Sequence, residues 1–259
     1  MNTKLAPMVR LAFAIGALLL AAYAPLSAAA KSNQQTYSSA EEASHALFLA
    51  VQNHDEPAVA EILQAGPSPL SADEELQDRL DRERFAQKYQ EMHRFTRQAD
   101  GSMVLYIGAE NWPFPIPLVS QNGAWHFDSD AGVHEIRYRQ IGENELAAIV
   151  LCQALAAQSH PGADGATDDT TATVLAAAKS GSRPLAFQGY YFRTLAGSGN
   201  HVFAVAYPVA YRSTGVMTFA VDAGGGTYEK DLGPSTAKIA GSMTEYRIDR
   251  TWTPAEATR

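Results

Sequence analysis

Two histidines and two acidic residues stand close together near the middle of the chain. His126 and Asp128 are two residues apart, which puts both side chains on one face of an expected strand, and His134 and Glu135 follow soon after. Imidazole and carboxylate groups bind zinc and similar metals. The chain has no His-Glu-x-x-His motif here, because Tyr138 occupies the position of the second histidine. A metal site at His126, Asp128 and His134 is therefore one alternative, beside the simpler interpretation that Asp128 caps a helix.

Aromatic residues offer a second kind of site, a binding surface. Strand alternation puts Tyr190 and Phe192 on one face and Tyr191 on the other, so part of this segment can remain exposed. An aromatic patch suits a peptide, a glycan or a partner protein. Large aromatic side chains are usually well buried, so we expect most of these rings to fill a core and Trp112 to be partly exposed. The candidate ligand-binding residues are Trp112, Phe114, Tyr190, Phe192, Tyr207 and Tyr211.

No complete set of catalytic residues can be named from the sequence. There is no Gly-x-Ser-x-Gly motif, no phosphate-binding loop and no dinucleotide fingerprint in a strand-to-helix setting. The only cysteine, Cys152, lies in an apolar run and is expected to be a small buried residue, so no disulfide within the chain can form. These observations favour a protein that is not an enzyme and has no cofactor.

The first thirty residues have the pattern of a signal peptide. Lys4 and Arg10 precede the apolar stretch 11–22, and Ala28 to Ala30 form a small-residue cleavage pattern. Pro25 interrupts the apolar run before it is long enough to span a membrane. We expect cleavage before Lys31, and export to the periplasm or outside the cell with no membrane anchor left.

The charge of the chain limits its partners. The full sequence has a net charge of −8, and residues 1–30 contain two basic and no acidic side chains, so the remaining chain has 18 basic and 28 acidic residues, a net −10. An anionic protein does not favour nucleic acid or anionic lipid. The partners we expect are an unknown envelope protein, a peptide or a glycan.

Periodicity predicts helices and then strands in the first half. Ser39 and Glu42 have capping-box spacing before a helix that ends near Asn53, and two more helices follow, the last over 71–89. Its mixed-charge run 78–84 is typical of a solvated, ion-paired face. Four strands (94–98, 103–107, 117–120 and 124–127) form a meander with turns at Asp100-Gly101 and Asn122-Gly123. The proline-rich segment 112–117 cannot be a central strand.

The second half is expected to be a separate β-meander. One helix after Phe127 runs to about Arg139, and another starts at 142–144, where Glu143 and Glu145 stabilise its positive end. The strands that follow cover 186–195, 201–209, 216–222 and 227–231, with a short helix at 234–239. The predicted fold class is α+β, with a signal peptide (1–30), a helical and β-meander domain (31–158), a linker with one short helix near 173–179 (159–185) and a C-terminal β-meander domain (186–259).

Several motifs in this order resemble a known family. They are residues 111–119 (NWPFPIPLV), 123–128, 141–149 (IGENELAAI), 189–193 (GYYFR), 215–219 (GVMTF) and 228–234 (YEKDLGP). Together they are similar to the bacterial exported family catalogued as domain of unknown function 2950, which has no established activity. Family members tend to have Glu where this chain has Ala210 and Gly where it has Arg212. The two halves also resemble nuclear transport factor 2-like and pilin-like folds, and a shared fold does not fix function.

The sequence thus predicts an exported, soluble envelope protein that acts as a non-catalytic binding or accessory module. The alternative is a metal-dependent or other hydrolase centred on His126, Asp128 and His134, acting on an envelope substrate.

Overall fold

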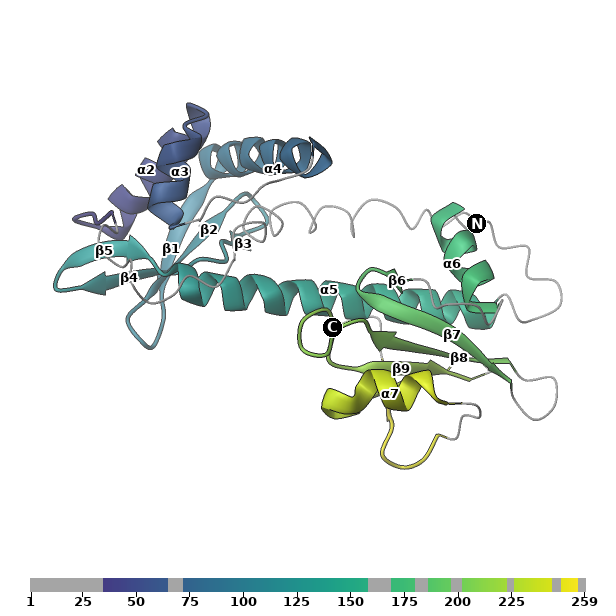
Figure 1. Ribbon diagram of the computed structural model, residues 1–259. Coiled ribbons are helices and arrows are strands. Elements are labelled where there is room, and N and C mark those ends of the chain that lie inside the picture. The colour runs from purple at the N-terminus through teal and green to yellow at the C-terminus, as the bar shows by residue number, and fades with distance from the viewer. Residues whose placement is uncertain are drawn as a thin grey trace. The chain divides into compact units, whose positions relative to one another are not determined.

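The computed structural model describes residues 35–64, 72–157, 169–179, 186–196, 202–222, 226–243 and 248–255. The chain forms two compact units, residues 1–138 and 139–259. Figure 1 shows helices and antiparallel sheets in each unit, which confirms the predicted α+β class. The expected signal peptide lies outside the described residues.

Three helices open the first unit: α2 (Ala40–Gln52), α3 (Glu56–Leu63) and α4 (Ala72–Glu91). Ser39 caps α2 as its spacing predicts, accepting the Glu42 backbone N–H at 3.0 Å. Asp55 caps α3 through the Ala58 N–H at 3.1 Å. Gln64 ends α3 in the left-handed conformation, with φ of 52°.

The charged run on α4 is ion-paired, as predicted, but it is not solvated throughout, because Asp81 is buried. Asp81 is fully buried and pairs with Arg84 at 3.2 Å. Arg82 pairs with Asp78 on its own helix and with Glu56 of α3. The ion pair between Arg82 and Glu56 joins two helices, and no local spacing in the sequence indicates it.

The sheet of the first unit has the strand order β1-β2-β4-β5, with β3 also pairing with β2, and all its pairs are antiparallel. Both predicted hairpins are confirmed: Gly101 has φ of 89°, and Asn122 and Gly123 have φ of 54° and 83°. The short β3 lies off the main strand path, as expected for a proline-rich segment. The strands are β1 (His93–Arg97), β2 (Met103–Ile107), β3 (Trp112–Pro113), β4 (Leu118–Gln121) and β5 (Ala124–Phe127).

The helices α2, α3 and α4 and the sheet share one apolar core. Aromatic rings link its layers: Phe85 of α4 lies 5.4 Å from Phe114, and Phe114 lies 5.9 Å from Phe127 of β5, measured between ring centroids. Ile136, from the helix after β5, belongs to the same core. This core fixes the position of the β5 end, where the candidate histidines lie.

One helix, α5 (Ser129–Ala157), replaces the two helices predicted after Phe127. The prediction of a break near Gly142 was wrong. Glycine inside a helix costs only about 1 kcal/mol relative to alanine, and the flanking sequence is compatible with a helix. The division between the two units falls inside α5, between Tyr138 and Arg139.

The sheet of the second unit is an antiparallel meander with the order β11-β10-β9-β8-β7-β6. Three of its strands lie close to the predicted ranges, and the predicted last helix is present as α7, preceded by the 3-10 turn η2. The prediction of one strand over 186–195 was wrong: Gln188 and Gly189 have positive φ and form a turn between the paired strands β6 and β7. The elements are α6 (Asp169–Lys179), β6 (Ala186–Phe187), β7 (Tyr190–Ala196), β8 (Val202–Pro208), β9 (Thr218–Val221), β10 (Thr227–Lys230), η2 (Gly233–Ser235), α7 (Thr236–Gly241) and β11 (Thr253–Pro254).

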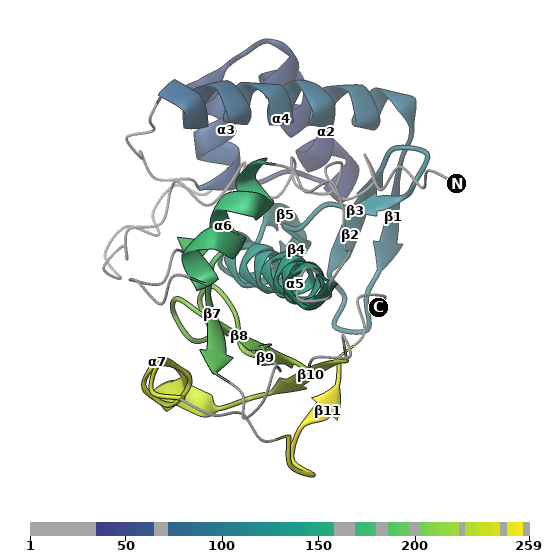
Figure 2. The same ribbon diagram turned by 90° about the vertical axis from the view of Figure 1, so that its right-hand side faces the viewer.

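Helices cover both faces of this second sheet (Figure 2). The second part of α5, with Ile149 and Cys152, and Val174 of α6 pack with Phe192 and Phe219 on one face. On the other face Ala240 of α7 packs with strand residues. The helix within the predicted linker 159–185 therefore contributes to the core of the second unit, and the observed division of the chain lies earlier than that linker.

Candidate functional site

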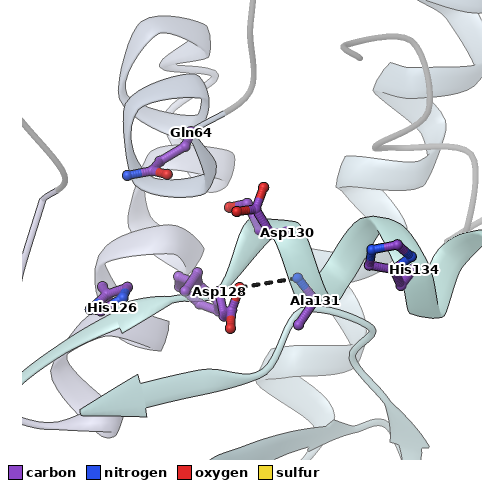
Figure 3. A pocket seen from close by; sticks show the side chains of 8 residues that line it. Gln64, His126, Asp128, Asp130, Ala131 and His134 are labelled. Carbon is purple, nitrogen blue, oxygen red and sulfur yellow. Dashed lines mark hydrogen bonds between the residues drawn. The ribbon is translucent and has the colours of Figure 1, made fainter. Parts of the chain in front are cut away.

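A pocket of about 310 Å³ lies where β5 ends and α5 begins (Figure 3). Its lining combines carboxylate, imidazole and amide groups, and all of it belongs to the first unit. The residues that line it are Gln64, His126, Phe127, Asp128, Ser129, Asp130, Ala131 and His134. The volume is at the lower end of the range for small-molecule sites.

Hydrogen bonds fix the wall of this pocket. Asp128 Oδ1 accepts the Ala131 backbone N–H at 3.0 Å, and the Asp128 N–H donates to the Pro117 carbonyl at 2.8 Å. The Ser129 hydroxyl donates to the carbonyl of Leu63, which ties the end of α3 to the start of α5. The interpretation of Asp128 as a helix cap is thus confirmed. The pocket is built from secondary structure termini held by these bonds.

The three residues of the metal alternative all line this pocket, but they do not gather around one point. In Figure 3 His126 and His134 lie on opposite sides of Asp128. Within the described ranges, no group of three or more His, Cys, Asp or Glu side chains is placed to hold a metal ion. His126 is half-buried on β5 and His134 is exposed on α5.

Sequence reasoning missed two polar residues of the pocket. Gln64 comes from the end of α3, far from Asp128 in the chain, and no local pattern links the two. Asp130 is exposed in the first turn of α5, where an acidic residue already has an ordinary role at the positive end of a helix. Their place in the pocket follows from the packing of α3 against the start of α5.

The six candidate aromatic residues do not form one exposed patch. Phe114, Tyr190, Phe192 and Tyr207 are each at most 4% exposed and belong to cores, as we expected for most of these rings. Trp112 is half-buried, as expected, and packs against the first core. Tyr211 is half-buried in the second unit, and its hydroxyl donates to Asp231 at 3.0 Å. Only these two rings keep an accessible surface that a ligand can contact.

Glu145, in the middle of α5, has a role that the sequence did not indicate. Glu145 does not serve a helix start: its Oε1 accepts the backbone N–H groups of Val216 and Met217 at 2.9 and 3.0 Å. The Tyr190 hydroxyl donates to the Met217 carbonyl at 3.0 Å. Burial, together with the nearby Glu145 carboxylate, raises the pKa of Tyr190, so the phenol stays protonated. Three of the motifs quoted above therefore meet at one place in the second unit.

The chain belongs to the family described as protein of unknown function DUF2950. The family model matches residues 34–168 and 161–255, which together span both units. No curated protein and no solved structure matches the chain. Among the described residues, no helix has the length and apolar character needed to cross a membrane.

Proposed function

We propose that this protein is an exported binding module of the bacterial envelope, without catalytic activity, and that it binds a small polar ligand in the pocket between β5 and α5. The observation that carries the proposal is the pocket itself: about 310 Å³, with two carboxylates, two imidazoles and one amide in its lining. A few polar groups around a concave site are the usual basis of small-ligand recognition.

The charges of the lining favour a ligand with an amino group. Asp128 and Asp130 are the charged side chains, and none of the described lining residues is Lys or Arg. Asp128 Oδ1 is already engaged by the Ala131 N–H, which leaves its second oxygen and both oxygens of Asp130 as acceptors of a ligand ammonium. The net negative charge of the whole chain also attracts a positively charged ligand.

Titration calorimetry with a charged and an uncharged probe tests the proposal. Glucosamine and cadaverine carry amino groups, whereas glucose and pentane-1,5-diol are matched probes without them. We expect binding of at least one amine that is weakened about tenfold or more in Asp130→Asn, since the negative charge that pairs with the ammonium is lost. Glu91→Gln removes an exposed carboxylate of the same unit that does not line the pocket, and it is the control. Equal responses of the two variants, or of the two probe classes, would contradict the proposal.

Export is tested separately from binding. The signal-like pattern of residues 1–30 supports it. When the full chain is expressed in a bacterium with a periplasm, we expect the product in the periplasmic or secreted fraction, with Lys31 as its first residue. An uncleaved product that stays in the cytoplasm would contradict export and leave the binding proposal to its own test.

A metal-dependent hydrolase is the second candidate: His126, Asp128 and His134 line the same pocket, and a metal bound there would have to draw the three side chains together. Metal analysis of the purified protein tests it. Stoichiometric zinc that is lost in His126→Ala would support this candidate over the binding module, as would hydrolysis of an envelope substrate that the same substitution abolishes.

A further inference from the structure

The connection between β8 and β9 is an exposed loop with many internal hydrogen bonds. We call residues 209–215 the 209–215 loop. The Val209 N–H donates to the Gly189 carbonyl at 2.9 Å, the Thr214 N–H to the Ala210 carbonyl at 2.9 Å, and the Arg212 N–H to the Gly215 carbonyl at 2.8 Å. The last two bonds lie within the loop, and the first ties its start to Gly189, just before β7, so backbone hydrogen bonds hold the loop in one conformation.

Side chains of α5 and β7 also hold this loop in place. The Asn144 amide, which is buried on α5, donates to the Thr214 carbonyl at 2.9 Å. Glu145 binds the two N–H groups that follow the loop, at Val216 and Met217. The Tyr190 ring lies against Gly215, where a Cβ atom would overlap its hydroxyl. These contacts fix the loop to α5 and β7.

Arg212 occupies a strained position at the tip of this fixed loop. Its φ is 60°, a conformation that favours glycine, and its side chain is exposed. The guanidinium carbon lies 5.5 Å from the centroid of the Tyr211 ring, and the guanidinium makes no hydrogen bond or ion pair with any described residue. Tyr211 is in turn held by Asp231. Strain of this kind is often found where a side chain is presented for binding.

We propose that the 209–215 loop recognises a single carboxylate on a peptide segment of a partner protein. A guanidinium presents a planar fork of donors that matches a carboxylate, and Tyr211 and the exposed Val209 offer apolar contact beside it. Because the loop is already ordered, binding does not have to order it. This site belongs to the second unit and does not depend on the pocket of the first unit.

The charges around the loop favour a single carboxylate over a phosphate-rich or membrane surface. Such surfaces are bound by several cations gathered together. Here the carboxylate of Asp231 holds the hydroxyl of the neighbouring Tyr211, and the chain as a whole is acidic. A dense array of negative charges would be repelled, whereas one carboxylate can pair with Arg212.

NMR titration of the full mature chain, labelled with ¹⁵N, tests the proposal at the Arg212 Nε–Hε signal and at the backbone N–H signals of Thr214 and Gly215, which remain in variants at position 212. The probes are the peptides acetyl-Ala-Asp-Leu-Ala-amide and acetyl-Ala-Asn-Leu-Ala-amide, which differ by one carboxylate. We expect a saturable shift with the Asp peptide only. Arg212→Lys keeps the charge without the fork and should weaken binding about tenfold. Arg250→Ala removes an exposed arginine of the same unit and should leave binding unchanged.

Arg212→Gly separates recognition from folding. Glycine adopts positive φ readily, so the melting temperature should hold or rise while binding is lost. The proposal is overturned if the Asn peptide shifts the signal equally, if neither peptide does, or if Arg250→Ala weakens binding as much as Arg212→Gly. Equal shifts with inorganic phosphate or phosphatidylglycerol vesicles at matched charge would also overturn it.

Discussion

Asp128 shows how one side chain in the candidate pocket also serves the fold. Its Oδ1 satisfies the Ala131 N–H at the start of α5, and its own N–H binds the Pro117 carbonyl. A pocket residue with such a role is recognisable from sequence only as a helix cap, because capping is a local pattern. Gln64 and Asp130 join it through tertiary packing, which no local pattern records.

Replacing Asp128 should therefore destabilise the protein. We expect Asp128→Ala to lower the free energy of unfolding by about 1 kcal/mol, and Asp128→Asn to lower it less because asparagine also caps helices. Chemical denaturation followed by circular dichroism measures both. Asp130 lines the same pocket, but its carboxylate caps no backbone N–H among the described residues, so Asp130→Ala should cost less than Asp128→Ala. Equal losses for the two alanine variants would contradict the capping role.

Cys152 gives a prediction about reactivity. It is fully buried in the core of the second unit, and burial raises the pKa of its thiol to about 12. Because the thiolate is the reactive form, the native protein should not react with Ellman's reagent at about pH 8. One thiol per chain should react in denaturing guanidinium chloride. Rapid reaction of the native protein would show that the second core opens readily.

Elements defined by local chemistry were predictable, and those that depend on remote contacts were not. The turns at Asp100-Gly101 and Asn122-Gly123 specify their hairpins, since glycine and asparagine accept positive φ. Gly142 predicts a helix boundary from its type alone, but α5 continues through it because residues before and after it pack into cores. The burial of Asp81 and the role of Glu145 likewise depend on residues distant in the chain.

Two glycines in motifs of the second unit should respond to alanine in opposite directions. At Gly142 a Cβ meets nothing within 4 Å, so Gly142→Ala should stabilise the protein by about 0.5–1 kcal/mol through higher helix propensity. At Gly215 a Cβ overlaps Tyr190, so Gly215→Ala should cost about 1–3 kcal/mol. Thermal and chemical unfolding measure both changes. If Gly215→Ala does not change stability, the close contact between Tyr190 and the 209–215 loop is contradicted.

At the scale of the whole molecule, the division of the chain inside α5 changes the meaning of the predicted linker. Composition alone marked 159–185 as a connection, because its residues are small and polar. The structure assigns Val174 and Ala178 of α6 to the second core, together with five residues of α5: Ala148, Ile149, Leu151, Cys152 and Leu155. The second sheet therefore needs helices that precede it in the chain to cover one face.

Fragments of the chain test this organisation. Residues 139–259 contain the covering helices and should fold cooperatively alone, whereas residues 186–259 lack them and expose Phe192 and Phe219 of the sheet. Circular dichroism during thermal unfolding distinguishes a cooperative from a gradual transition.

For the same reason, a protease cut between 159 and 168 should leave two pieces that elute together in gel filtration, because α5 on the first piece remains packed in the core of the second. If the cut pieces separate under native conditions, or if 186–259 unfolds cooperatively, the second sheet is stable without α5 and the boundary belongs in the linker.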